Sequence, residues 1–371
     1  MAVRCDIFCT VIDNFGDLGV CWRIARQLST EHEVSVTLWV DDLVSFQLLA
    51  PSLNPNLAEQ ALDAITVRHW HDNAAWPAPA NLVIEGFGCH LPEAYVLAMA
   101  QAVRPPVWIN LEYLSAEAWV ESCHGMTSTH PQLGLNKTFW FPGFTQRTGG
   151  LLREANLITR LDHVAGDGRR HISLFSYENS AIAGLLDSLA ADTAATTLYV
   201  FQGRALPVVQ AWVGHTLTTP YQRGNLTIKV LPMLPHVEFD ELLARCDLNL
   251  IRGEDSFVRA LWAGKTLLWH IYPQSELAHA DKLQAFIQAM LTQTDMPDIW
   301  QSTMLGWNQL VQEATLDWPA FLQALPQMQK AILQWREYLL QQPDLTTQLM
   351  RFYTNQVESS PNSVHTGKHT S

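Results

Sequence analysis

Two aspartates stand four residues apart in a short loop that follows a strongly apolar segment. Asp13 and Asp17 enclose the sequence Asn-Phe-Gly. Paired carboxylates can grip a cationic group and take a proton from it, which suits general-base chemistry. They can equally stabilise the start of a helix, where N–H groups and the helix dipole favour Asp. One cap suffices for one helix, so the spacing leaves both interpretations open.

The segments around this loop indicate where it lies in the fold. Residues 4–12 read as a buried strand, and an amphipathic helix pattern follows the loop. This order opens a doubly wound parallel sheet, in which ligands bind outside the carboxyl ends of the strands. Asp13 and Asp17 would face that crevice, and Gly16 would let the backbone approach a ligand. Asn14 stands where a G-x-G-x-x-G motif needs its first glycine, so the loop is a poor dinucleotide fingerprint.

A second group of polar residues follows a predicted strand at residues 248–251. Ser256 and the free N–H groups of the next helix could hold a diphosphate, and Arg252 could neutralise its charge. Glu254 and Asp255 would repel a phosphate, so they suit sugar or ribose hydroxyls better. The alternative is an ordinary acidic first turn of a helix.

Three further polar side chains come directly after predicted strands. Tyr272 and Gln274 follow the last strand, and Tyr177 follows the first strand of the second half of the chain. They could stack on a ligand or hydrogen-bond to it, although Tyr-Pro is also a common way to leave a strand. We interpret His270 as a core histidine.

The order of strands and helices predicts an α/β protein with two doubly wound domains that face each other across a cleft. Two series of predicted strands are separated by a stretch from residue 138 to 150 in which the pattern breaks into aromatic, Gly and Pro residues. We place the domains at residues 1–168 and 169–355, with an unstructured tail at 356–371. The predicted strands are 4–12, 34–40, 65–70, 82–85 and 107–111, then 172–176, 198–201, 227–231, 248–251 and 266–271.

Composition narrows the class of partner and the compartment. The 371 residues carry a formal net charge of -13, which argues against binding to a nucleic-acid backbone. The six cysteines form no C-x-x-C pair, and no basic stretch with a long apolar run opens the chain. We therefore expect reduced thiols, no metal site, no membrane span and a cytoplasmic location.

The two polar groups together resemble the signature of the arginine rhamnosyltransferases of elongation factor P. The matching stretches are residues 6–9 with 11–17, 19–23, 252–260, 262–265 and 269–274, and the resemblance covers about residues 4 to 355. It implies a GT-B fold, two Rossmann-like domains with the active site between them. It also implies dTDP-β-L-rhamnose as the donor, transfer with inversion to an arginine of elongation factor P, and no metal or other cofactor.

The resemblance also implies roles for single residues. Asp13, Asp17 and Glu254 would be the essential carboxylates, with Asp17 as the base. The residues implied in donor binding are Asn14, Phe15, Gly16, Tyr177, Arg252, Asp255, Ser256, Tyr272 and Gln274. One departure is Met233, which stands where an aromatic residue is expected near the thymine, although Met can also pack on a flat base.

An arginine acceptor explains why carboxylates are needed. Freeing a guanidinium with a pKa above 12 of its proton at pH 7 costs roughly 7 to 9 kcal/mol. Two carboxylates can localise the charge and take the proton as the C–N bond forms. The sequence leaves open a transferase with another sugar or acceptor, a non-catalytic nucleotide-binding module, and a nicotinamide-dependent oxidoreductase.

Overall fold

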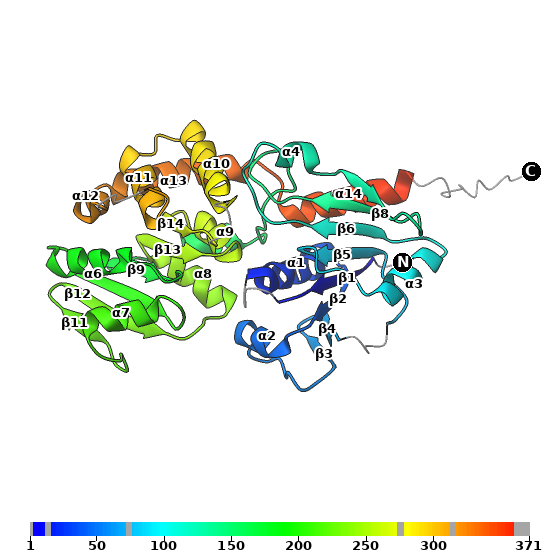
Figure 1. The fold of residues 1–371 in the computed structure, drawn as a ribbon, viewed down its shortest axis with the longest axis horizontal. Helices are drawn as coiled ribbons and strands as arrows, with labels where there is room; N and C mark the ends of the chain where they lie inside the picture. Colours follow the sequence, from blue (N-terminus) through cyan, green and yellow to red (C-terminus); the bar gives the residue numbers. More distant parts are fainter. Residues whose placement is uncertain (1–2, 12–15, 72–75, 273–277, 312–315, 360–371) are drawn as a thin grey trace, which may run out of the picture.

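A computed structural model describes residues 3–11, 16–71, 76–272, 278–311 and 316–359. Within these ranges the chain forms two α/β halves that lie side by side, each around its own sheet (Figure 1). We call them the N-terminal half and the C-terminal half. The predicted α/β class with two doubly wound domains is confirmed.

The N-terminal half contains an eight-stranded sheet in the order β3-β4-β2-β1-β5-β6-β8-β7. Its central strand β1 pairs in parallel with β2 and β5, and every residue of β1 after Arg4 is buried. Strands β3 and β7 are antiparallel and close the two edges. The strands are β1 (Arg4–Cys9), β2 (Ser35–Val40), β3 (Glu59–Leu62), β4 (Ile65–His69), β5 (Leu82–Gly86), β6 (Val107–Leu111), β7 (Thr127–Thr129) and β8 (Asn136–Trp140).

The C-terminal half contains a six-stranded sheet in the order β11-β12-β10-β9-β13-β14, parallel except for the edge strand β11. Strands β13 and β14 are buried along their whole length, as expected for a parallel sheet covered on both faces. The strands are β9 (Arg170–Leu174), β10 (Thr196–Phe201), β11 (Tyr221–Arg223), β12 (Leu226–Leu231), β13 (Leu248–Arg252) and β14 (Thr266–His270).

Helices cover the sheets and join the two halves. Those of the N-terminal part are α1 (Gly16–His32), α2 (Leu43–Leu49), α3 (Glu93–Gln101), α4 (Val120–Cys123) and α5 (Leu157–Asp162). The later ones are α6 (Ala181–Ala191), α7 (Leu206–Val213), α8 (His236–Arg245), α9 (Asp255–Ala263), α10 (Ala278–Gln293), α11 (Asp298–Trp307), α12 (Trp318–Gln323), α13 (Leu325–Leu340) and α14 (Leu345–Ser359).

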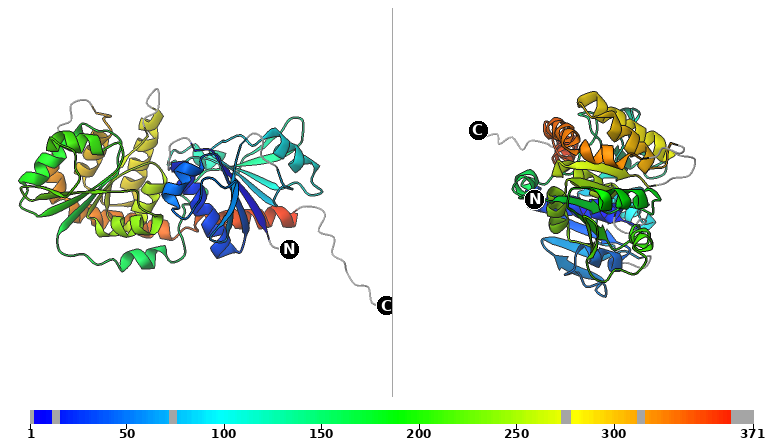
Figure 2. Two further views of the ribbon diagram at one scale, coloured as in Figure 1. Left: turned by 90° about the horizontal axis from the view of Figure 1, so that it is seen from below. Right: turned by 90° about the vertical axis from the view of Figure 1, so that its left-hand side faces the viewer.

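The last helix crosses back to the first half. Leu345, Leu349 and Tyr353 of α14 are buried in the hydrophobic core of the N-terminal half, beside residues of α1 and β1. Figure 2 shows this return from the orange helices to the red one. Assigning all residues up to 355 to the second domain therefore does not describe α14. The helix also includes residues 356–359, which we expected in the tail; they are exposed and continue the helix beyond its last buried residue, Tyr353.

The ten predicted strands are confirmed, with ends that agree to within three residues. Strand β8 corrects the prediction, because it occupies residues 136–140 and so overlaps the start of the stretch 138–150, for which we predicted no strand. Its side chains alternate between exposed and buried at the side of the sheet, so no continuous apolar run marks it. The edge strands β3, β7 and β11 were not predicted either, because none of them contains a continuous apolar run.

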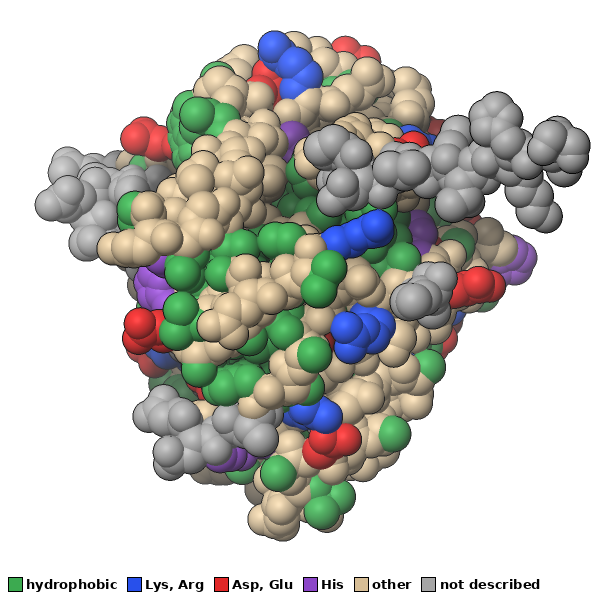
Figure 3. Space-filling model, turned by 90° about the vertical axis from the view of Figure 1, so that its right-hand side faces the viewer, with side chains coloured by type: hydrophobic (Ala, Val, Ile, Leu, Met, Phe, Trp, Pro, Cys, Tyr) green, Lys and Arg blue, Asp and Glu red, His purple; other side chains and the backbone are tan. Residues whose placement is uncertain are grey.

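No helix in the described ranges is long and apolar enough to cross a membrane. The outer end of the N-terminal half carries its cationic side chains scattered among apolar and neutral ones (Figure 3). That face therefore shows no clustered basic patch of the kind that nucleic-acid backbones select.

Candidate active site

A pocket lies where the carboxyl ends of the C-terminal strands meet the first half of the molecule. The N-terminal half contributes Gly16 at the start of α1 and Leu49 at the end of α2. The C-terminal half contributes Phe175, Phe201, Met233, Leu234, His236, Phe239 and residues 252–256. This is the position at which doubly wound sheets bind ligands.

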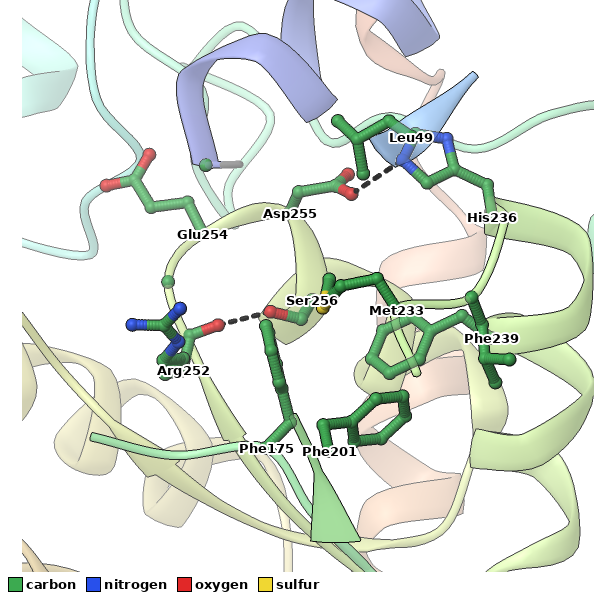
Figure 4. A pocket seen from close by; sticks show the side chains of 13 residues that line it. Leu49, Phe175, Phe201, Met233, His236, Phe239, Arg252, Glu254, Asp255 and Ser256 are labelled. Atoms are coloured by element: carbon green, nitrogen blue, oxygen red, sulfur yellow. Dashed lines mark hydrogen bonds and ion pairs between the residues drawn. The ribbon is translucent and has the colours of Figure 1, made fainter. Parts of the chain in front are cut away.

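Three phenylalanines give one side of the pocket an aromatic wall. Phe175 and Phe201 follow or end β9 and β10, and their ring centroids lie 5.3 Å apart. Phe239 of α8 lies 5.5 Å from Phe201, and Met233 projects into the same group (Figure 4). The sequence analysis did not identify these phenylalanines as site residues. Phe175 and Phe201 could have been identified, because each is an aromatic residue at the carboxyl end of an apolar strand, where ligands bind. Met233 lies where a base contact was expected, and the aromatic faces come from its neighbours.

Arg252 ends β13 beside this wall. Its guanidinium carbon lies 4.9 Å from the Phe175 ring centroid and 4.7 Å from that of Tyr177, so the side chain is buried against two aromatic faces. Among the described residues, no hydrogen-bond partner satisfies its Nη1 atom. Burial and the nearby Arg252 charge lower the pKa of His270 to about 4, so His270 is neutral at pH 7. A buried cation with an unsatisfied nitrogen is suited to an anionic ligand.

The start of α9 lies next to Arg252. Gly253 takes a φ of +69°, a conformation open to glycine, and thereby turns the chain from β13 into the helix. The Ser256 hydroxyl donates a hydrogen bond to the Arg252 carbonyl, so its oxygen is turned toward the backbone. The first N–H groups of the helix have no intrahelical partner and face the pocket end, which favours an anion there.

Two of the predicted carboxylates approach one short segment after β6. The Tyr113 hydroxyl donates to Asp17 Oδ2 at 3.4 Å, and the Leu114 N–H donates to Glu254 Oε2 at 2.9 Å. Lys282 of α10 donates to the other oxygen of Glu254 at 2.6 Å. Asp17 is the second residue of α1 and Glu254 immediately precedes α9. Carboxylates from both halves of the molecule therefore bond to two neighbouring residues, Tyr113 and Leu114.

Asp255 faces the opposite way, into the interface between the halves. Its Oδ1 accepts from Arg23 Nη1 at 2.9 Å and its Oδ2 from Arg259 Nε at 2.7 Å, while His236 Nε2 lies 3.6 Å from Oδ2. Burial alone would raise the pKa of Asp255, but the two guanidinium groups hold it well below its usual range. Both oxygens are thus engaged by protein cations, which favours a structural role over direct contact with a donor.

Arg23 of α1 links the two halves of the molecule at this interface. Besides Asp255, it donates to Glu154 Oε1 at 2.9 Å and Oε2 at 2.7 Å in the segment that joins the halves. Arg259, which also bonds to Asp255, donates to Asp240 of α8 at 2.8 Å. A Cβ atom at Gly19 would lie 3.1 Å from Asp255 Oδ2, so glycine lets α1 approach α9 closely. This network fixes α1 and α9, at whose starts Asp17 and Glu254 lie, against each other.

Of the remaining predicted site residues, the structure describes Tyr177 and Tyr272. Tyr177 is buried with its ring 5.6 Å from that of Tyr272, which is half exposed at the rim. Tyr177 therefore contacts both Arg252 and Tyr272. Asp13, Asn14, Phe15 and Gln274 lie outside the described residues. Within the described ranges, no group of three or more His, Cys, Asp or Glu side chains is placed to hold a metal ion.

Comparison with known families gives one match across nearly the whole chain. Residues 5–354 match the model of the elongation factor P (EF-P) rhamnosyltransferase EarP. The chain is 44% identical to a protein-arginine rhamnosyltransferase of Pseudomonas putida, covering 96% of this chain and 100% of that protein. It is 41% identical to one of Pseudomonas aeruginosa, covering 94% and 98%.

Solved structures give the same picture at the level of the fold. A structure described for EarP-mediated arginine glycosylation of translation elongation factor EF-P has a TM-score of 0.64 at 32% identity, covering 95% of this chain and 99% of that one. The glycosyltransferase of kitacinnamycin has a TM-score of 0.53 at 11% identity, covering 95% and 99%. The architecture is the GT-B fold of two facing Rossmann-like domains.

Proposed function

The chain belongs to the EarP family of rhamnosyltransferases, and we propose that it moves L-rhamnose from dTDP-β-L-rhamnose to an arginine of elongation factor P, with inversion, in the cytoplasm. It is a glycosyltransferase that acts on protein arginine. The observation that carries the finer proposal is that Asp17 and Glu254, from opposite halves, bond to the neighbouring residues Tyr113 and Leu114. A guanidinium there would face two carboxylates.

We propose that the pocket lined by Glu254 binds the donor. The wall of Phe175, Phe201 and Phe239 suits a flat pyrimidine base, since aromatic rings stack on one another. Arg252 and the free N–H groups of α9 lie between this wall and Glu254, where the diphosphate of a bound nucleotide sugar would lie. This arrangement would bring the sugar to the carboxylates at the other end of the pocket.

These positions suggest a separate role for each charged residue in the transfer reaction. We propose that Asp17 takes the proton from the acceptor nitrogen as that nitrogen attacks the sugar carbon and the bond to the diphosphate breaks. Glu254 would hold the guanidinium or the sugar, together with Asp13, as the family resemblance implies. The departing charge would be stabilised by Arg252 and the helix start, so transfer is expected to continue in the presence of EDTA.

The test is mass spectrometry of elongation factor P after incubation with this protein and dTDP-rhamnose. We expect one added deoxyhexose on one arginine. Omission of the donor and the Asp17→Asn variant serve as controls. Modification with another nucleotide sugar at a higher rate, or none with dTDP-rhamnose, would contradict the proposed substrates.

A further inference from the structure

Tyr113 occupies an unusual position for an aromatic residue. Its side chain is 39% exposed, although both Leu111 and Leu114 around it are buried. Its hydroxyl donates to Asp17, and the next residue's N–H donates to Glu254. Residues 113 and 114 therefore bond to both carboxylates, and part of the Tyr113 side chain is exposed.

Phe87 backs this ring. The ring centroids of Phe87 and Tyr113 lie 4.7 Å apart with an interplanar angle of 25°, a stacked pair. Phe87 has a φ of +55°, which costs a bulky residue conformational energy. Its N–H donates to the Leu111 carbonyl at 2.7 Å, and that bond fixes the end of β5 to the end of β6.

The residue before Phe87 helps to hold the pair in place. A Cβ atom on Gly86 would come within 2.8 Å of the Phe8 carbonyl oxygen and 2.9 Å of Cys21 Sγ. Glycine therefore allows β5 to end in close contact with β1 and α1. The same contact places Phe87 next to the start of the helix that carries Asp17.

The surroundings of the Tyr113 ring favour a cation. Asp17 and Glu254 flank it, and aromatic faces themselves carry negative potential. Lys282 already approaches, with Nζ 5.7 Å from the ring centroid while it bonds to Glu254. Burial raises the pKa of Tyr113 and the two carboxylates raise it further, so the phenol keeps its proton and acts as a donor to Asp17.

We propose that Tyr113 and Phe87 form an aromatic wall of the acceptor subsite, along which a planar guanidinium lies while its N–H groups meet Asp17. The proposal rests on the arginine acceptor of the proposed function. The Tyr113 hydroxyl has a second task, since its hydrogen bond holds the Asp17 carboxylate toward that guanidinium.

The chemistry of the wall selects arginine over lysine. A guanidinium is flat and weakly hydrated, so it can lie on an aromatic face and still donate along its edge to carboxylates. An ammonium group is compact and strongly hydrated, and it gains less from such a surface. The stacked pair therefore adds shape recognition to the charge recognition that the carboxylates supply.

Two variants of Tyr113 separate the two tasks. Tyr113→Phe keeps the ring and removes the hydroxyl, so kcat should fall several-fold while the KM for elongation factor P stays unchanged. Tyr113→Leu removes the ring as well, so this KM should rise by about tenfold, the scale of a cation–π contact in a partly desolvated site. Phe87→Leu should raise the KM in the same direction, and affinity for dTDP-rhamnose should stay constant in all three.

Trp119→Leu is the matched control, since Trp119 is also an exposed aromatic residue of this half but packs on Phe141. An unchanged KM in Tyr113→Leu, or an equal rise in Trp119→Leu, would overturn the proposal. If Tyr113→Leu fails to fold, the KM of Phe87→Leu decides the question in the same way. An inactive wild-type protein would instead overturn the proposed function, so the two failures can be told apart.

Discussion

Glu254 and Asp255 are neighbours in sequence but lie on different surfaces of the molecule. Glu254 precedes α9, faces the cleft and bonds to one backbone N–H and one lysine. Asp255 begins the helix, lies in the interface between the halves and is held by two arginines. Successive helical residues point about 100° apart, so one step along the chain moves a carboxylate from the cleft to the interface. Two adjacent acidic residues can therefore have different roles, one at the ligand-binding cleft and one in the interface that holds the two halves together.

The same distinction applies to Asp17 and gives the largest expected effect. Asp17→Asn keeps the size and one acceptor oxygen but removes the charge and the basicity. Loss of a general base typically costs 10²- to 10⁴-fold in rate, whereas Asn stabilises a helix start about as well as Asp. We expect near-native melting, retained donor binding and almost no rhamnosyl transfer, measured at saturating donor. More than about a tenth of the wild-type rate would assign Asp17 to the helix start instead.

Asp255→Asn should act on stability. Removing one partner of a buried ion pair leaves an uncompensated charge and costs about 3 to 5 kcal/mol. The measurement is the free energy of unfolding in urea. Asp162→Asn is the control, because Asp162 pairs with Arg336 at 2.9 Å but its side chain is 50% exposed, and such pairs are worth less than about 1 kcal/mol. Equal losses in both variants would show that the Asp255 network has no special structural weight.

Arg252→Ala should act on donor binding with an intermediate effect. Hydrogen bonds to charged groups contribute about 1.5 to 3 kcal/mol, so the affinity for dTDP should fall by roughly 10- to 100-fold in calorimetry. Arg223→Ala is a control, since Arg223 lies 4.5 Å from the Trp212 ring, outside the pocket lining. Unchanged dTDP affinity in Arg252→Ala would place the diphosphate elsewhere.

We expect a smaller effect of pH on the free energy of unfolding, through His236 in the interface between the halves. Burial lowers the pKa of His236 to about 3, below the unfolded value of about 6.5. As pH falls below about 6.5, the unfolded chain takes up a proton that the folded chain refuses, so stability falls, by about 2 kcal/mol at pH 5. The slope of unfolding free energy between pH 6.5 and 5 should be reduced in His236→Gln. An unaltered slope would mean that His236 does not titrate in this way.

The sequence predicted the strands of the sheet interiors because each is a continuous apolar run, as in residues 248–251. It also predicted that Arg252 and Glu254 follow such a strand at the ligand-binding edge. It did not reveal the edge strand β11, whose exposed residues have no apolar pattern. The Arg23–Asp255 pair joins residues 232 positions apart, and nothing in local sequence predicts such a contact. Tyr113 could have been predicted as a site residue from the sequence, because it is an aromatic residue two positions after an apolar strand.

The most direct test compares Glu254→Gln with Asp255→Asn in one assay for rhamnosyl transfer and one for urea unfolding, at a temperature at which both are folded. The account predicts that Glu254→Gln, which weakens a single ion pair with Lys282, lowers the unfolding midpoint less than Asp255→Asn does and loses about a hundredfold or more in kcat. It predicts that Asp255→Asn unfolds at clearly lower urea and keeps a larger share of the rate. The opposite assignment, or two variants with the same profile, would contradict the separation of cleft and interface carboxylates.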